Sequence, residues 1–378
     1  MTKETHEFAH VPGTNFMILS QMSNSQLLKI DLDPTTQAVV GIMSFPMGRS
    51  HESGLHGVWP STLYPGKMWL TLQKENKLLL VDPGKDMATV PIIIKEINIP
   101  KPGNGPHCVF EIGNRVWAGL KEASHETGGY YVYSADIPSI MGQTSSNVTD
   151  QRWSNTSNAV DQKLYPCLNS PVFIVEEPET KLIYVTQDVD SSIMRINTTS
   201  GETTQMAIPP SYGNTPVGLI AGHGRMSGVW FTLAGNKTGG QGSFGRITPK
   251  GEMQMFNLRS IRSGKPGLLH LADASTKEGG PALWLVSTSL LSIHSPDALI
   301  RVTFDDDVAS MKHEELLDMP TQNAMLHRVR TMNDSVFVSE LNTFSLAHVK
   351  YTNVPAGQWL PSQATEDRNV GFVFAKPA

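Results

Sequence analysis

Three histidines occupy the same place in short apolar segments that lie far apart in the chain. His56 lies in Leu-His-Gly-Val-Trp, His107 in Gly-Pro-His-Cys-Val and His327 in Met-Leu-His-Arg-Val. A fourth, His270, follows Leu268-Leu269, one residue further along its segment. Imidazole exchanges protons near neutral pH, orients carbonyl groups through its N–H and binds transition metals. These four residues are therefore the first candidates for chemistry.

Each of these segments opens a unit of roughly 40 to 60 residues that recurs along the chain. Residues 214–258 show the unit best, with four short apolar stretches separated by turns of Gly, Pro and Asn. Four antiparallel strands per unit are typical of a propeller blade. About seven units predict an all-β fold, a seven-bladed β-propeller of four-stranded antiparallel blades, with six blades as the alternative. The N-terminal unit has no obvious first strand, so we expect residues 369–373 to complete it and close the ring.

The mouth of the channel should be lined by the starts of the first strands and the ends of the second strands, because these lie on one side of the disc. The predicted catalytic residues are His56, His107, His327, Gln187 and Glu340. The predicted substrate-binding residues are Thr71, Leu72, Gln73, Leu120, Leu233, His270 and Ser287. A mouth that combines hydrocarbon with neutral donors and acceptors suits an uncharged, hydrophobic small molecule.

The repeat resembles that of virginiamycin B lyase-like seven-bladed propellers and, more distantly, that of gluconolactonase-like propellers. Residues 214–258 carry this resemblance most closely, with Trp-Phe-Thr in one strand and Gly-Arg-Ile in the next. The lyase resemblance implies a ring of His and Glu around a divalent ion that assists cleavage of a lactone C–O bond. Glu340 is the one carboxylate left at the family's Glu positions, and three of the others are Leu. Hard divalent cations prefer several oxygen ligands, so we expect no metal and no other cofactor, with zinc on His56, His107 and His327 as an alternative.

The chain is also similar to fungal propellers of this kind that act as intermolecular hetero-Diels–Alderases. This resemblance implies a cofactor-independent enzyme that joins a tropolone quinone methide to a hydrophobic terpene. Holding two reactants in register can supply several kcal/mol of the barrier, about 7–11 kcal/mol in the best cases. The alternatives are a metal-dependent C–O lyase or lactonase, and a non-catalytic propeller that serves as a binding scaffold.

The composition limits the classes of binding partner and the cellular compartments that we expect for the protein. The 378 residues carry a net charge of −5 and no basic stripe, so we expect small-molecule substrates and no nucleic acid. The longest apolar runs fall short of a membrane span, and the polar start is no signal peptide. Two cysteines are expected to be free thiols, with a pair as the alternative, and Asn-x-Ser/Thr sites are mildly in excess. We expect one domain over residues 1–378, with an insertion at 134–165 as a candidate lid, and a soluble protein, cytoplasmic or secreted, of undetermined oligomeric state.

Overall fold

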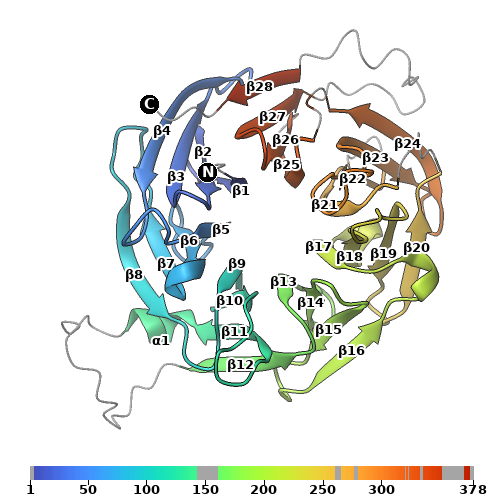
Figure 1. The fold of residues 1–378 in the computed structure, drawn as a ribbon, viewed down its shortest axis with the longest axis horizontal. Coiled ribbons are helices and arrows are strands. Elements are labelled where there is room, and N and C mark those ends of the chain that lie inside the picture. Colours follow the sequence, from blue (N-terminus) through green and yellow to red (C-terminus); the bar gives the residue numbers. More distant parts are fainter. Residues whose placement is uncertain are drawn as a thin grey trace.

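The chain folds into seven four-stranded antiparallel sheets that surround a central axis like the blades of a propeller (Figure 1). The structure, a computed structural model, describes residues 4–142, 161–259, 265–275, 280–319, 321, 323–332, 335–350 and 370–374. The first strand of each blade lies nearest the axis and the fourth strand lies at the rim (Figure 1). The predicted all-β propeller with seven blades is confirmed.

The strands follow one another in chain order within every blade. Blade 1 is β1 (Thr5–His10), β2 (Phe16–Gln21), β3 (Gln26–Leu32) and β4 (Val39–Pro46). Blade 2 is β5 (Leu55–Pro60), β6 (Met68–Leu72), β7 (Lys77–Asp82) and β8 (Ile92–Asn98). Blade 3 is β9 (Pro106–Ile112), β10 (Arg115–Leu120), β11 (Tyr130–Asp136) and β12 (Gln162–Cys167), with helix α1 (Ile137–Met141) between its last two strands. Blade 4 is β13 (Pro171–Glu176), β14 (Ile183–Gln187), β15 (Ser192–Ile196) and β16 (Thr203–Ala207).

The remaining blades have the same order. Blade 5 is β17 (Pro216–Gly222), β18 (Gly228–Leu233), β19 (Ser243–Ile247) and β20 (Met253–Asn257). Blade 6 is β21 (Leu268–Asp273), β22 (Ala282–Ser287), β23 (Ala298–Phe304) and β24 (Met311–Asp318). Blade 7 is β25 (Leu326–Met332), β26 (Ser335–Glu340), β27 (Ser345–Lys350) and β28 (Val370–Phe374). Three short 3₁₀ helices, η1 (Gln73–Glu75), η2 (Pro210–Tyr212) and η3 (Gly224–Met226), complete the described elements.

Burial changes with distance from the axis. All residues of β6, β14, β18 and β26 are buried, because both faces of a blade pack against neighbouring blades. The rim strands β4 and β8 have only one buried residue each. The apolar second-strand segments of the sequence are therefore the packing layer of the disc, which explains why the repeat was visible there.

The ring closes differently from our prediction. Residues 370–374 form β28, which pairs with β27 of blade 7, so the prediction that this segment completes the N-terminal unit is wrong. Blade 1 has its own first strand, β1, which pairs with β2. The sequence Thr-His-Glu-Phe-Ala-His hides this strand because its inward-facing residues are polar. The two ends of the chain meet as complete blades.

A hydroxyl side chain near the end of the second strand joins neighbouring blades at five interfaces. Thr71 Oγ1 accepts from the Gly57 N–H of its own blade and donates to His107 O of the next blade, at 2.7 and 2.9 Å. Thr232 makes the same two bonds, with Gly218 N at 3.1 Å and Leu269 O at 3.0 Å. Equivalent hydroxyl bonds to the next blade come from Ser20, Thr186 and Ser339. These bonds hold the first strands at a fixed spacing around the channel.

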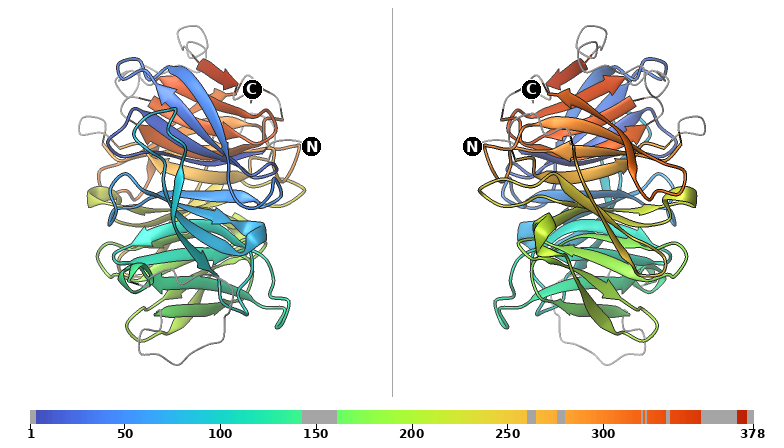
Figure 2. Two further views of the ribbon diagram at one scale, coloured as in Figure 1. Left: turned by 90° about the vertical axis from the view of Figure 1, so that its left-hand side faces the viewer. Right: turned by 90° about the vertical axis from the view of Figure 1, so that its right-hand side faces the viewer.

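Strand direction separates the connections into two faces, seen from the side in Figure 2. The first strands begin at the same face, here called the top face, that carries the loops between second and third strands. The connection from β11 to β12 includes α1 and belongs to the opposite face. The candidate lid at 134–165 is thus rooted opposite the first-strand starts, and its residues 143–160 lie outside the described part of the chain. Among the described residues, no helix has the length and apolar character needed to span a bilayer.

Candidate functional site

The second residue of each first strand lies at the top of the channel. We call these seven residues the first-strand ring: His6, His56, His107, Val172, Val217, Leu269 and His327. Each first strand shows a register irregularity at this point, where it pairs with its second strand. Such bulges redirect side chains at the rims of sheets and barrels. The ring is divided: blades 7, 1, 2 and 3 supply imidazoles, and blades 4, 5 and 6 supply hydrocarbon.

The four imidazoles of the ring are in contact. The ring centroids of His56 and His107 are 3.5 Å apart and stacked, and those of His6 and His56 are 4.3 Å apart. His327 completes the group, with its centroid 4.9 Å from that of His6. One nitrogen from each of His6, His56 and His327 lies within 4.8 Å of the other two. We call these three residues the histidine cluster.

Local hydrogen bonds fix the orientation of three of the four rings. His56 Nδ1 donates to His107 O at 2.8 Å. A Cβ on Gly57 would lie 2.8 Å from the same carbonyl oxygen, so glycine allows blades 2 and 3 to approach closely enough for this bond. His107 Nδ1 donates to Gln73 Oε1 at 3.0 Å, and His6 Nε2 lies 3.2 Å from the carboxylate of Glu4.

Burial sets the charge state of these imidazoles. It holds the pKa of His56, His107 and His327 well below the usual value, because a buried imidazolium loses its hydration. Neighbouring imidazoles lower the pKa further, since a second positive charge would be repelled. The rings are therefore neutral at physiological pH and available as hydrogen-bond partners or metal ligands.

The residues that follow the first-strand ring residues in their strands form a second layer, deeper in the channel, and this layer contains a buried ion pair. Arg328 Nε lies 3.2 Å from Glu7 Oε2, and both residues are buried. The Arg328 guanidinium also lies over the Phe173 ring at 4.8 Å and contacts His270 Nε2. Because that nitrogen faces a donor, neutral His270 carries its proton on Nδ1, which is buried without a hydrogen-bond partner among the described residues. Burial also holds the pKa of His270 well below its usual value.

Arg330 lies two residues beyond Arg328 in β25. Its guanidinium lies over the Trp59 ring at 5.0 Å. Burial, with the nearby charge of Arg328, lowers the pKa of Arg330 to about 9. The channel thus contains two arginines and Glu7 below the layer of imidazoles.

A cavity of about 80 Å³ opens between the two halves of the ring. Its apolar wall consists of Val172, Phe173, Val217, Leu269, Leu290 and Leu291. Its polar wall consists of His107, His270 and His327 together with Lys121 and Asp188, whose charged groups are 3.4 Å apart. The arrangement can hold an apolar body on one side and a carbonyl or hydroxyl group on the other.

The structure brings together the histidines predicted from the sequence. His56, His107 and His327 belong to the first-strand ring, and His270 joins His107 and His327 around the cavity. Gln73 is next to them through its hydrogen bond with His107. The roles predicted for these residues remain predictions.

The predicted residues from the second strands lie elsewhere, because the second strands face neighbouring blades and not the channel. Gln187 accepts from Leu168 N and Asn169 N, and its amide nitrogen donates to Ser192 and Gln205. Leu72 and Leu120 are core residues that are 1% and 0% exposed. The other residues of this group form local bonds or line a different hollow: Thr71, Leu233, Ser287 and Glu340. The expectation that second-strand ends line the mouth is therefore wrong in its geometry.

Sequence reasoning missed two residues of the site, His6 and Glu7. Both lie in β1, the strand that was not recognised. The spacing along the chain could have revealed this strand. His6 precedes the apolar stretch 16–21 by nearly as many residues as separate His56 from the stretch 68–72. The hydrophobic pattern alone could not find a strand whose inner residues are His and Glu.

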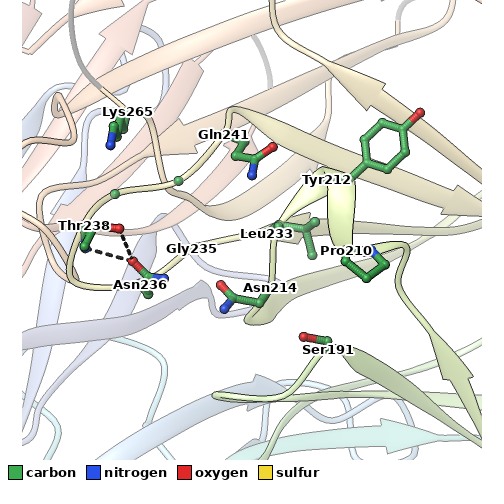
Figure 3. Close-up of a pocket in the computed structure, with 13 residues that line it drawn as sticks. Ser191, Pro210, Tyr212, Asn214, Leu233, Gly235, Asn236, Thr238, Gln241 and Lys265 are labelled. Carbon is green, nitrogen blue, oxygen red and sulfur yellow. Dashed lines mark hydrogen bonds between the residues drawn. The ribbon is translucent and has the colours of Figure 1, made fainter.

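A second hollow, of about 520 Å³, lies on the top face over blades 4 to 6 (Figure 3). Tyr212, Asn214, Gln241 and Lys265 surround it, and much of the lining is exposed. Residues 240–245 have the Gly-x-Gly-x-x-Gly spacing of dinucleotide-binding loops. That motif requires a strand followed by a helix, whereas these residues lead into β19 of an antiparallel pair, so they provide no nucleotide site.

The two cysteines are free. Cys108 is buried beside Val172 O in the innermost strand β9, and Cys167 lies in the rim strand β12. Burial raises the pKa of each thiol to about 12, which keeps both protonated. Neither thiol is suited to act as a nucleophile.

Comparison with known proteins identifies the fold. No family model and no curated protein sequence matches the chain. The structure is similar to selenomethionine-substituted virginiamycin B lyase from Staphylococcus aureus, with a TM-score of 0.61 and 18% identity over 90% of this chain and 94% of that one. It is also similar to a functionally unknown protein from Desulfotomaculum acetoxidans, with a TM-score of 0.60, 12% identity and coverage of 97% and 100%.

A third similar structure is YCF48 bound to D1 peptide, with a TM-score of 0.60 and 11% identity over 93% of each chain. Identities this low establish a common fold and carry no activity from one protein to another. The chain is a seven-bladed β-propeller that shares the fold of virginiamycin B lyase-like propellers.

Proposed function

We propose that the protein is an enzyme that binds hydrophobic small molecules at the top of the channel and joins two of them by cycloaddition. The proposed reaction is an intermolecular hetero-Diels–Alder addition of a tropolone quinone methide to a hydrophobic terpene. The observation that carries the proposal is the division of the first-strand ring into imidazole on one side and hydrocarbon on the other. Such a site suits one partner with a carbonyl group and a second that is apolar throughout.

A cycloaddition requires that the protein position the two reactants and polarise the heterodiene. One C–C bond and one C–O bond form together, no group leaves and no proton is transferred. His270 Nδ1–H is a buried donor without a partner among the described residues, and it can donate to the heterodiene oxygen. A donor aimed at an oxygen that gains negative charge in the transition state contributes about 3–4 kcal/mol in well-studied enzymes.

The cavity accommodates the reacting ends of the substrates. Its volume of about 80 Å³ is below the range of about 300–1,000 Å³ that encloses a whole ligand. The bodies of the substrates therefore extend over the top face. Val217 and Leu269 would pack against the alkene while the carbonyl partner faces His270, which sets the two reactants in register.

A second function, a metal-dependent C–O lyase or lactonase, is favoured by the histidine cluster, in which three buried nitrogens converge. The two functions differ in their products. A cycloadduct has the summed mass of two substrates, whereas a lyase or lactonase converts one cyclic ester into an open product.

The test is product analysis with His270→Ala and Val217→Ala. We expect His270→Ala to lower kcat for adduct formation by about 10²-fold with little change in KM, because a transition-state contact is lost. Val217→Ala should mainly raise KM, because it removes apolar contact. His10→Gln, at the far end of β1, serves as the control and should leave both constants unchanged. Full adduct formation by His270→Ala would overturn the assigned role, and turnover of single lactones without adducts would favour the second function.

A further inference from the structure

We propose that His6, His56 and His327, with Glu7 beside them, form a binding site for a late first-row divalent ion such as Zn²⁺ or Co²⁺. The site lies at the junction of blades 7, 1 and 2. This differs from the metal-free mouth expected from the sequence, which considered only the second-strand carboxylate positions. It deepens the proposed function by assigning a Lewis acid to the same site, although the binding itself requires no assumption about the reaction.

Unsatisfied nitrogens are the first observation that supports the site. His6 Nδ1, His56 Nε2 and His327 Nδ1 are buried and have no hydrogen-bond partner among the described residues. The three side chains belong to residues that are 8%, 1% and 8% exposed. A buried polar atom without a partner costs about 1–3 kcal/mol, so three in one cluster indicate a missing common partner. One nitrogen from each ring already lies within 4.8 Å of the others.

The nitrogens of His56 and His6 that face away from the cluster support the same conclusion. His56 Nδ1 donates to a backbone carbonyl, His107 O, and His6 Nε2 lies within hydrogen-bond distance of the Glu4 carboxylate. Since both partners can only accept, the ring nitrogens that face them, His56 Nδ1 and His6 Nε2, carry protons. The lone pairs are then on His56 Nε2 and His6 Nδ1, the two unpartnered atoms. Metal-binding histidines show this arrangement, in which the second nitrogen donates to a carboxylate or carbonyl.

Charge around the cluster favours a cation there. Glu7 Oε1 is buried without a hydrogen-bond partner among the described residues and lies 3.9 Å from His327 Nδ1. Its other oxygen pairs with Arg328. The carboxylate is therefore fixed in place with one oxygen turned toward the cluster.

The ligand set selects the kind of ion. Three neutral imidazoles and one carboxylate suit Zn²⁺, Co²⁺, Ni²⁺ or Cu²⁺, whereas Mg²⁺ and Ca²⁺ need more oxygen ligands. A tetrahedral ion with Zn–N bonds of about 2.0–2.1 Å places its nitrogens about 3.3 Å apart. Because the nitrogens lie within 4.8 Å of one another, each ring would move inward by about 1 Å at most on binding. His327 also lines the cavity, so a bound ion would have access to a substrate oxygen there.

The experiment measures binding in the full chain without substrate. Purified protein is treated with a chelator, dialysed and titrated with Zn²⁺ by calorimetry and with Co²⁺ by visible absorption. We expect one equivalent of either ion, with the intense d–d absorption of a tetrahedral Co²⁺ site. His56→Gln and His327→Gln should each weaken binding by more than 100-fold. Glu4→Gln, which alters only the outer contact of His6, should weaken it by about 10-fold.

His10→Gln is the matched control, because it changes a histidine of the same strand as His6 outside the cluster. It should bind the ion like the unaltered protein, and thermal unfolding would confirm that every variant is folded. Absence of stoichiometric binding, or equal binding by folded His56→Gln and His327→Gln, would overturn the site. Because no step involves turnover, failure here leaves the cycloaddition to its own test.

Discussion

Burial keeps the channel histidines uncharged and thereby links the stability of the fold to pH. The pKa values of His56, His107, His270 and His327 are all held well below the usual value by loss of hydration. In the unfolded chain these groups titrate near about pH 6.5. Below that pH the unfolded chain takes up protons that the folded protein does not, so folding stability must fall as the pH falls.

The free energy of unfolding should therefore decrease between pH 7 and pH 5.5. Each histidine contributes a slope of about 1.4 kcal/mol per pH unit below its unfolded pKa. Urea unfolding of chelator-treated protein at several pH values measures the slope. The variant His107→Gln keeps a polar group beside Gln73. It should reduce the slope by the contribution of one histidine, about 1.4 kcal/mol per pH unit. Equal slopes for the two proteins would show that His107 is protonated in the folded state.

At the scale of single elements, the second strands control the spacing of the channel wall. Five of them place a Ser or Thr hydroxyl between two first strands, whereas blades 3 and 6 have Gly119 and Val286 at this position. A Cβ on Gly119 would lie only 2.8 Å from Pro171 O. Blades 3 and 4 are thus packed by direct backbone approach. This close junction lies where the ring changes from His107 to Val172.

Replacing one of these hydroxyls should destabilise the propeller. Thr232→Val leaves Gly218 N and Leu269 O without their partner, and we expect a loss of about 1–3 kcal/mol in the free energy of unfolding. Thr232→Ser keeps the hydroxyl and loses one methyl group, so its loss should be about 0.8 kcal/mol. Chemical denaturation of the three proteins measures both values. If Val and Ser were equally tolerated, the hydroxyl bonds would contribute little to the stability of the ring.

At the scale of the whole molecule, the contact between blades 7 and 1 closes the ring without a shared strand. Ser339 donates to His6 O at 2.8 Å, and Thr5 donates to Glu340 O at 2.5 Å. An apolar cluster continues the contact, with Phe8 and Leu19 packed against Phe337. Every other pair of neighbouring blades is also joined by the chain itself. This junction depends on side chains and hydrogen bonds alone.

Opening of the ring should therefore begin at this junction. Phe8→Ala removes a fully buried ring there, and we expect a loss of about 3–5 kcal/mol together with faster hydrogen exchange of the amides of β1 and β25. Phe231→Ala removes an equally buried ring within blade 5 and is the matched control. Exchange that rises evenly around all blades in Phe8→Ala would contradict a preferred opening point.

The sequence predicted the blades well and the site only in part, for the same physical reason. Second strands are buried on both faces, so Val229-Trp230-Phe231 and their counterparts are apolar and easily recognised. The strand β1 supplies polar side chains to the channel, so it has no hydrophobic pattern and its residues His6 and Glu7 were missed. Gln187 was misplaced because the direction of a second-strand side chain depends on a neighbouring blade. The pairing of distant blades is set by the curvature of the complete ring.

The order in which the blades are synthesised determines when the first-strand ring is completed. His6, His56 and His107 leave the ribosome within the first three blades, but His327 belongs to blade 7 and follows more than two hundred residues later. The hydrocarbon half, from blades 4 to 6, is made between them. A nascent chain thus lacks its fourth imidazole until blade 7 packs against blade 1. The first-strand ring is completed in the final assembly step, so a partly made chain has neither all four imidazoles nor the complete cavity beside them.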